Sequence, residues 1–315
     1  MPEMSDPGDR KTKRQKKVLW IVLLVILFSI MLVLVFINWI DKSNGEIVSS
    51  DQKREYLIHV PEAYEGSTAV PLVISLHGFG EWPAHHMRIN HWDELAEEHG
   101  FIVVYPSGTH FPKRWIMHEN GFLGGETMED VVFISDLIDT LTGEYNIDTD
   151  RIYVNGFSNG GGMSVLLACK LADRITAIGI VASSGNFSTK GCTPSRPVPV
   201  IAFHGTEDPL VPYYEESVSL HSTGKADVLN RVMSWAERNQ CDMDPVEIPP
   251  IGEVSGIKYT GCNQMAQVHL YTIHGGGHSW PGGDAMPRII VGHTTDDVDA
   301  TAVMWDFFSR YSLAP

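Results

Sequence analysis

Basic residues are scarce in this chain. Its 315 residues include 23 Lys and Arg against 39 Asp and Glu, which gives a formal net charge of −16 at pH 7. Residues 1–17 hold six basic and three acidic side chains, a net +3, so the rest of the chain carries −19. A surface this acidic repels phosphate groups, and we therefore exclude nucleic acid as a partner.

Cysteine is sparse as well, and metal-binding patterns are missing. The sequence has no C-x-x-C pair and no His/Cys cluster with zinc-ligand spacing, so we expect no metal and no cofactor. The histidines at 85–91 are more typical of a helix surface or a pocket rim. The even number of cysteines indicates disulfides in an oxidising compartment. Three pairings are possible among Cys169, Cys192, Cys241 and Cys262. Spacing favours Cys241 with Cys262, and Cys169 could also be a buried thiol.

One long stretch without charge differs from the rest. Residues 18–40 carry no charged side chain, and at about 1.5 Å per residue they can cross a hydrocarbon core of roughly 30 Å as one helix. Six basic residues precede this stretch, whereas Asp41 and Lys42 offset each other just after it. The positive-inside rule then keeps the N-terminus in the cytoplasm and places the C-terminal part outside. We predict a single-pass membrane anchor.

A cleaved signal peptide, which would yield a secreted protein, is the alternative. The run is longer than the usual apolar region of about 7–15 residues, and no Ala precedes Ala63 to form a cleavage site. Asn186 begins a glycosylation sequon, which is informative only in a eukaryotic host. We divide the chain into a basic cytoplasmic tail at 1–17, a transmembrane anchor at 18–40, a linker at 41–51 and one globular domain at 52–315.

Strand and helix patterns alternate after the linker. An alternating pattern predicts a strand at 54–60. Near-continuous apolar runs predict further strands at 70–78, 101–108, 151–156, 175–185, 198–205 and 268–277. Amphipathic patterns predict helices at 89–99, 128–145, 161–173, 227–239 and 297–311. Continuous apolar strands are covered on both faces, so the fold class is α/β, with a mostly parallel, doubly wound sheet preceded by the transmembrane helix. Such sheets bind ligands at the carboxyl ends of their strands.

The motif G-x-S-x-G is present once, around Ser158. It follows the strand at 151–156 and opens the helix at 161–173, as a nucleophile elbow requires. Flanking glycines permit the tight turn that exposes the serine hydroxyl at the edge of the sheet. An ordinary Gly-rich turn would also contain such a pattern, so the assignment depends on a base and an acid further along the chain.

Suitable partners follow, each just past a predicted strand. Asp208 is the candidate acid, with Glu207 as its rival, and His278 on a glycine-rich loop is the candidate base, with His274 as its rival. The order Ser158, Asp208, His278 is that of the α/β-hydrolase triad.

Two backbone amides are needed to stabilise the oxyanion. We expect one from Asn159, directly after the nucleophile, and the other from Phe79 or, failing that, Gly78, after the strand at 70–78. Three tryptophans near the same edge are candidate walls of the substrate pocket, although large aromatic residues are more often part of a core. These are Trp82, Trp115 and Trp280.

Several segments together resemble one known group. "LHGFGE", "RIYVNGFSNGGGMSVLLACKLADRI", "CTPSRPVPVIAFHGTEDPLVPY", "SWAERNQC" and "HGGGHSWPGG" are similar to the polyhydroxybutyrate depolymerase, feruloyl esterase and acetylxylan esterase group of α/β-hydrolases, the carbohydrate esterase family 1-like branch. The resemblance covers roughly 54–311. It implies triad roles for Ser158, Asp208 and His278, supports a Cys241–Cys262 disulfide and suggests a second one between Cys169 and Cys192.

The resemblance implies a serine esterase acting through an acyl-enzyme on feruloyl, acetyl or hydroxyalkanoate esters. Phe79 stands where depolymerases of the group often have Cys, and a membrane anchor suits an insoluble polymer poorly, so we expect a small or saccharide-linked ester. The acyl and alcohol groups and the oligomeric state are not encoded in any motif. A serine peptidase of the same fold and a non-catalytic binding ectodomain are the alternative functions.

Overall fold

The computed structural model describes residues 16–31, 42–117, 128–183, 192–214 and 228–313. It divides the chain into Met1–Lys42 and Ser43–Pro315. In the first unit residues 16–31 are helical, and their side chains are exposed. Among the described residues no helix is both long and apolar enough to cross a membrane. Residues 32–40 of the predicted anchor, most of the basic tail and Asn186 lie outside the described residues.

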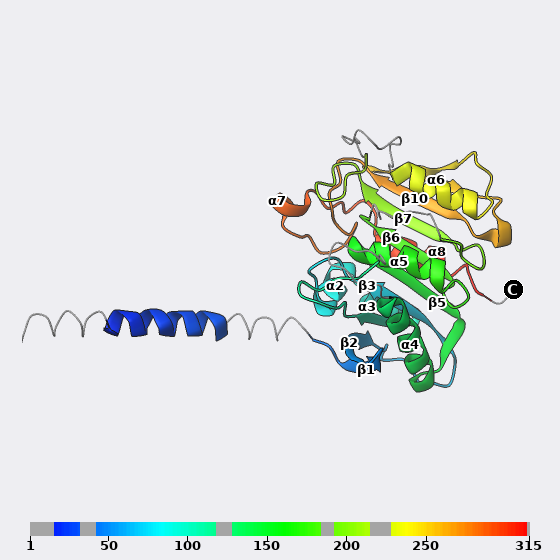
Figure 1. Ribbon diagram of the computed structural model, residues 1–315. Helices are drawn as coiled ribbons and strands as arrows, with labels where there is room; N and C mark the ends of the chain where they lie inside the picture. The colour runs from blue at the N-terminus through cyan, green and yellow to red at the C-terminus, as the bar shows by residue number, and fades with distance from the viewer. Residues whose placement is uncertain (1–15, 32–41, 118–127, 184–191, 215–227, 314–315) are drawn as a thin grey trace, which may run out of the picture. The chain divides into compact units, whose positions relative to one another are not determined.

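The unit Ser43–Pro315 is built on one ten-stranded sheet (Figure 1). In spatial order the strands are β1 (Gly45–Ser49), β2 (Gln52–His59), β4 (Ile102–Pro106), β3 (Val70–Leu76), β5 (Ile147–Phe157), β6 (Ala177–Val181), β7 (Val200–Gly205), β10 (Val268–Ile273), β9 (Val254–Tyr259) and β8 (Val246–Ile251). The strands from β4 to β10 in this order are parallel, and the pairs at both edges are antiparallel. The predicted mostly parallel α/β sheet is confirmed.

Helices cover both faces of this sheet (Figure 1). They are α2 (Pro83–Asn90), α3 (Trp92–His99), α4 (Glu129–Glu144), α5 (Asn159–Lys170), α6 (Val228–Arg238), α7 (Arg288–Val291) and α8 (Ala300–Phe308). The helix predicted at 89–99 is in fact two helices. His91 adopts a left-handed conformation with φ of 54° and ends α2, so α3 begins on a new axis. Most of the histidine-containing stretch at 85–91 belongs to α2.

Some elements of the structure were not predicted from the sequence. The linker at 41–51 is wrong in its second half, because Gly45–Ser49 forms β1 and pairs antiparallel with β2. The edge hairpin of β8 and β9 was not predicted, and neither was α7. The burial pattern explains the miss at β8, whose residues are almost all exposed, so its sequence carries little of the apolar signal by which buried strands are recognised.

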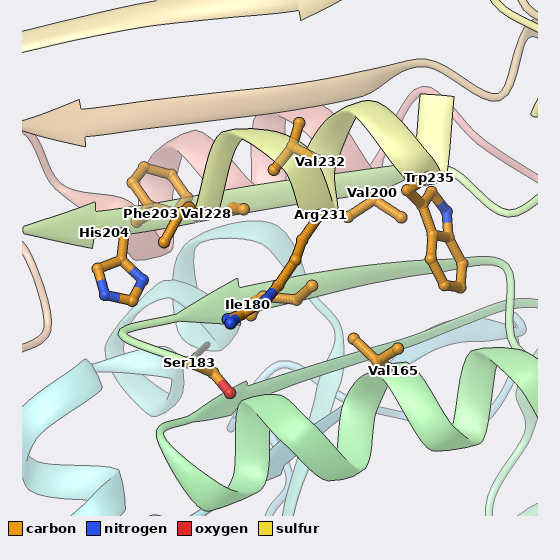
Figure 2. Close-up of a pocket in the computed structure, with 11 residues that line it drawn as sticks. Val165, Ile180, Ser183, Val200, Phe203, His204, Val228, Arg231, Val232 and Trp235 are labelled. Carbon is orange, nitrogen blue, oxygen red and sulfur yellow. The ribbon is translucent and has the colours of Figure 1, made fainter. Parts of the chain in front are cut away.

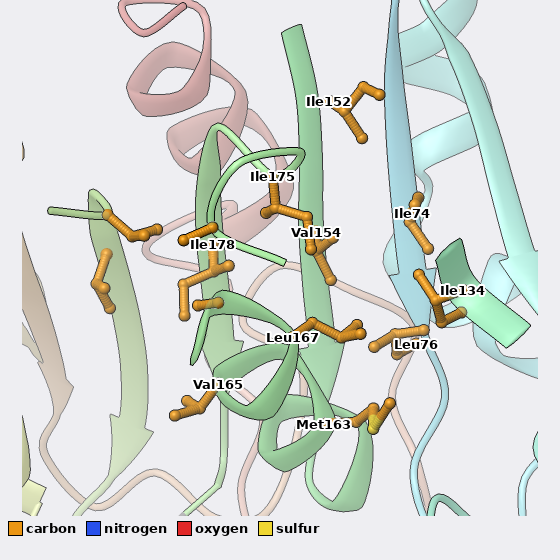
Figure 3. Close-up of a cluster of buried hydrophobic side chains, with 14 of the residues drawn as sticks. Ile74, Leu76, Ile134, Ile152, Val154, Met163, Val165, Leu167, Ile175 and Ile178 are labelled. Carbon is orange, nitrogen blue, oxygen red and sulfur yellow. The ribbon is translucent and has the colours of Figure 1, made fainter. Parts of the chain in front are cut away.

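The core has two layers, one on each face of the sheet. Successive strand residues point to opposite faces, so Ile74 joins the cluster under α4, α5 and α6, while its neighbour Val73 joins the cluster under α3 and α8. Figure 3 shows the first cluster, in which Leu76 and Val154 from the strands meet Leu167 of α5. Burying both faces of the central strands fixes their carboxyl ends at one edge of the sheet.

Both disulfides are present. Cys169 near the end of α5 pairs with Cys192, and Cys241 after α6 pairs with Cys262. The pairing favoured by spacing and the one implied by the resemblance are therefore confirmed. No free cysteine occurs in the described part of the chain. Each disulfide fastens a connection at the end of a helix that packs on the first core cluster.

Candidate active site

Ser158 lies at the turn between β5 and α5. Its φ of 52° and ψ of −114° place the backbone in a strained region, which costs a non-glycine residue on the order of 1–3 kcal/mol. The turn closes only because its neighbours lack side chains. A Cβ on Gly156 would lie 2.3 Å from the carbonyl of Gly160, and one on Gly160 would lie 2.2 Å from Leu76 O. The sequence therefore forms the predicted elbow, with a partly exposed serine at its tip.

The structure brings the predicted acid and base together. His278 Nδ1 donates to Asp208 Oδ2 at 2.7 Å, and both side chains are buried. Asp208 Oδ1 accepts the amides of Leu210 and Val211 at 2.9 and 2.7 Å. This carboxylate is therefore fixed by its own loop after β7, and it fixes the tautomer of His278 with the proton on Nδ1.

The base also lies at the nucleophile elbow. The ring of His278 packs against Phe157, the residue before Ser158, with ring centroids 4.9 Å apart. No hydrogen bond joins Ser158 Oγ to His278 within the described residues, and such bonds are often formed fully only when substrate is bound. The rivals are placed elsewhere. Glu207 is exposed, and the exposed His274 bonds to Ser255 through Nε2 at 2.8 Å.

A second histidine borders the acid, and sequence reasoning missed it. His204 at the end of β7 has Nε2 3.6 Å from Asp208 Oδ2, and Nε2 donates to Val211 O at 2.8 Å. Burial is the main cause that lowers the pKa of His204, so the ring is neutral. The neutral ring packs beside Asp208 and donates a hydrogen bond to the loop after β7 that carries Asp208, which we call the acid loop.

The loop after β3 presents a free amide at the predicted position. Among the four amides from residue 78 to residue 81, Gly78 N donates to Glu81 Oε2 at 2.8 Å, Gly80 N to Lys113 O at 2.7 Å and Glu81 N to Gly78 O at 3.3 Å. Phe79 N takes part in no hydrogen bond within the described residues. Of the two predicted donors in this loop, Gly78 is therefore already occupied and Phe79 remains available.

The side chain of Asn159 has a role that the sequence did not indicate. Asn159 Oδ1 accepts Trp115 N at 2.7 Å, and Asn159 Nδ2 donates to Trp115 O at 3.2 Å. The indole of Trp115 in turn donates to His77 O at 2.9 Å. This chain of bonds joins the elbow to the β3 loop. His77 accepts Gly108 N and donates to Gly78 O, and burial lowers its pKa to about 4, so it stays neutral near pH 7.

The three tryptophans predicted to line the pocket occupy different environments. Trp115 is 2% exposed and Trp280 is 1% exposed; each packs in a core cluster. Trp280 Nε1 donates to Thr301 Oγ1 at 2.9 Å. Trp82 is half-buried at the start of α2. Only Trp82 is therefore placed where a ligand could contact it without displacing core packing.

A cavity of about 60 Å³ lies between α5 and α6 over β6 and β7. Figure 2 shows Ser183 and His204 at one end of it, with Trp235 at the other. Arg231 and apolar side chains of both helices and of β6 and β7 form the rest of its wall. Ser183 also packs against the first turn of α5, since a Cβ on Gly161 would lie 2.8 Å from Ser183 Cβ. The cavity thus adjoins both the elbow and the acid loop.

The described part of the chain contains no cluster of metal-ligating side chains. No group of three or more His, Cys, Asp and Glu side chains there is arranged to hold an ion. Asp208 and His278 are instead joined directly to each other by a hydrogen bond between carboxylate and imidazole.

The chain is similar in sequence to several known esterases. The family described as esterase PHB depolymerase matches residues 55–196. Feruloyl esterase B of Piromyces equi is 29% identical over 269 residues, covering 82% of this chain and 46% of that protein. A bifunctional acetylxylan esterase/xylanase of Neocallimastix patriciarum is 33% identical over 170 residues, covering 53% of this chain. This chain covers only 24% of that second protein's length. Feruloyl esterase D of Neurospora crassa is 26% identical, covering 85% of this chain and 87% of that protein.

Among solved structures, an acetyl xylan esterase from Aspergillus awamori has the same fold. Its TM-score is 0.56 at 15% identity, over 75% of this chain and 93% of that one. Fold and elbow define an α/β-hydrolase. The matched family region and the sequence relatives make the chain similar to the group of polyhydroxybutyrate depolymerases and feruloyl and acetylxylan esterases, the resemblance that the sequence motifs indicated.

Proposed function

We propose that this chain is a serine esterase that hydrolyses carboxylic esters through an acyl-enzyme on Ser158. The observation that carries the proposal is the 2.7 Å bond between His278 Nδ1 and Asp208 Oδ2, with the His278 ring packed beside the elbow that presents Ser158. Asp208 fixes the imidazole so that Nε2 is the basic nitrogen, and it stabilises the imidazolium that forms during the reaction.

The proposed reaction has two halves. His278 Nε2 takes the proton of Ser158 as Oγ attacks the ester carbonyl, and the amides of Asn159 and Phe79 donate to the oxyanion of the tetrahedral intermediate. His278 then gives the proton to the leaving alcohol, and the acyl group stays on Ser158. Water repeats these steps and releases the acid. The chemistry requires no cofactor.

The relatives suggest the class of ester. Of the three sequence relatives, two are named feruloyl esterases and one a bifunctional acetylxylan esterase/xylanase, so we take a feruloyl or acetyl ester of a saccharide as the preferred substrate. A hydroxyalkanoate ester, suggested by the name of the matched family, is the next choice. A peptidase or a binding ectodomain of the same fold is separated from these by the substrate panel described next.

Active-site labelling tests the proposal directly. A fluorophosphonate probe should modify the full-length chain at Ser158 and leave Ser158→Ala unmodified. A separate, unlabelled sample of the parent protein is then profiled with feruloyl, acetyl and hydroxybutyryl esters and with aminoacyl p-nitroanilides. Labelling at another residue, or cleavage of anilides in preference to every ester, would show that the proposed function is wrong.

The location of the enzyme is a second part of the proposal. We place residues 18–40 across a membrane, with the domain after it outside the cytoplasm. The exposed apolar side chains of the helical residues 16–31, the basic residues before them and the two disulfides support this arrangement. Two separate experiments test it: alkaline extraction of isolated membranes, and treatment of intact cells with an external protease. Release by alkali, or protection of the domain from external protease, would contradict it.

A further inference from the structure

One buried acid near the site has no part in the proposed reaction. Glu81, just before α2, has a side chain that is only 12% exposed, and burial raises its pKa to about 7. Burying a carboxyl group costs free energy unless hydrogen bonds compensate it, so the bonds of Glu81 indicate why an acid occupies this position. Within the described residues its one close hydrogen bond is to the backbone of the β3 loop, where Gly78 N donates to Glu81 Oε2 at 2.8 Å.

Both backbone polar groups of Gly78 are held by hydrogen bonds. Its N–H is bound by the Glu81 side chain, and its carbonyl accepts Glu81 N at 3.3 Å and His77 Nδ1 at 2.7 Å. The next anchored amide is that of Gly80, which donates to Lys113 O. The peptide between these anchors is the one that carries the N–H of Phe79, so its orientation follows from how Gly78 is held.

The same carboxyl group lies against the nucleophile strand. A Cβ added to Gly78 would be 3.1 Å from Glu81 Oε2 and 3.1 Å from Phe157 Cδ1, so these three residues meet without free space. Phe157 precedes Ser158 and packs on His278. The position of the β3 loop relative to the elbow is therefore set where Glu81, Gly78 and Phe157 touch.

The nearby histidines do not explain the acid. His85 Nδ1 and His86 Nδ1 lie 3.6 and 3.8 Å from the two carboxyl oxygens, beyond hydrogen-bond distance. Burial lowers the pKa of both rings, that of His86 strongly, so neither supplies a positive charge near pH 7. An ion pair is thus a poor account of why a carboxyl group is kept here, and the bond to Gly78 N is a better one.

We propose that Glu81 is a positioning residue of the oxyanion hole. Its carboxyl group binds the N–H of Gly78 and so holds the backbone of Gly78 in the orientation in which the following N–H, that of Phe79, faces the reacting carbonyl. This inference rests on the proposed esterase function. Because the bond needs only an acceptor oxygen, an amide can replace the carboxyl group. A side chain without an acceptor cannot, and it leaves the Gly78 N–H without a partner in a buried place.

Steady-state kinetics of three variants of the full-length chain with an acetyl ester test the inference. Glu81→Leu should lower kcat about 100-fold, as loss of one oxyanion donor does, with little change in KM. Glu81→Gln should restore kcat to within about threefold of the parent, because its side-chain oxygen accepts the same amide. Glu97→Leu is the matched control. Glu97 also accepts a backbone amide, that of Glu62 at 3.0 Å, but it lies on α3, so kcat should not change.

The outcomes separate the two proposals. If the parent chain hydrolyses no ester, the proposed function is wrong. If the parent is active and Glu81→Leu keeps the parent's kcat, with or without a change in KM, Glu81 does not position the oxyanion hole. Should the Leu variant fail to fold, the Gln variant still decides: a large loss of kcat in a folded Glu81→Gln protein overturns the inference, and a retained kcat supports it.

Discussion

His278 and Asp208, 70 residues apart in the sequence, meet through a 2.7 Å hydrogen bond between Nδ1 and Oδ2. Asp208 is itself fixed by the amides of Leu210 and Val211, so the acid cannot turn away from the imidazole without losing two further bonds. The pair holds His278 with Nδ1 protonated and Nε2 free to act as the base.

Asp208→Asn should therefore reduce kcat by on the order of 10⁴-fold while the fold is retained. The amide keeps the shape of the side chain, but its NH₂ group can donate to Nδ1 and so favours the wrong tautomer of His278. Steady-state hydrolysis of an acetyl ester measures the loss, and circular dichroism reports the fold. The rival acid supplies the control: Glu207→Gln should leave kcat unchanged, and a larger loss there than at Asp208 would contradict the assignment.

Gly160→Ala should destabilise the protein strongly. The added Cβ would lie 2.2 Å from Leu76 O and 2.6 Å from His77 O, so the strand and the helix would have to separate at the elbow. We expect a lower melting temperature and loss of fluorophosphonate labelling at Ser158.

Gly143→Ala in α4 is the matched control for that change, because no atom lies within 4 Å of its added Cβ. Alanine is favoured over glycine in a helix by about 1 kcal/mol, so this variant should be as stable as the parent or more so. Equal melting temperatures for the two variants would show that the close approach at Gly160 does not matter.

The stability of the parent relative to Glu81→Gln should depend on pH. Burial raises the pKa of Glu81 from 4.5 to about 7 in the folded state. The folded state therefore binds more protons than the unfolded state between these values. The resulting stabilisation of the folded state is complete below 4.5, the pKa of Glu81 in the unfolded chain. It is lost as the pH rises through about 7, the pKa of Glu81 in the folded state.

Urea unfolding of both proteins at several pH values measures this effect. Relative to Glu81→Gln, the parent should lose up to about 3 kcal/mol of unfolding free energy between pH 4.5 and pH 8. Curves that stay parallel across this range would mean that Glu81 titrates in the folded protein as it does in the unfolded chain.

We expect the acyl group to occupy the cavity between α5 and α6, because the end formed by Ser183 and His204 adjoins the elbow and the acid loop. Val232→Phe should fill part of the cavity and lower kcat/KM for a butyryl ester about tenfold or more relative to an acetyl ester, since each buried CH₂ contributes roughly 0.8 kcal/mol.

Leu229→Phe is the control for the cavity. Leu229 lies on the same helix, is 38% exposed and does not line the cavity, so its chain-length profile should match that of the parent. If Val232→Phe also keeps the parent's ratio of butyryl to acetyl hydrolysis, the acyl group binds elsewhere.

The sequence by itself determined the fold class and the elbow, and it predicted the residues of the proposed triad. Continuous apolar strands and amphipathic helices are local patterns, and the glycines around Ser158 report a tight turn without reference to any distant residue. The order of Ser158, Asp208 and His278 then placed each of them after a strand of the parallel sheet, where chemistry was to be expected. Edge elements such as β1 and β8 were missed because exposed strands lack that apolar pattern.

Only the tertiary structure decided which groups within each loop are free to act. The sequence favoured Phe79 over Gly78 as the donor without excluding either. In the structure Gly78 N bonds to the Glu81 side chain and Gly80 N to Lys113 O, and among the described residues of this loop the Phe79 amide is left available. Burial likewise assigned Trp115 and Trp280 to the core. Hydrogen bonds and burial between residues far apart in the chain depend on how the layers pack, and no local pattern records that packing.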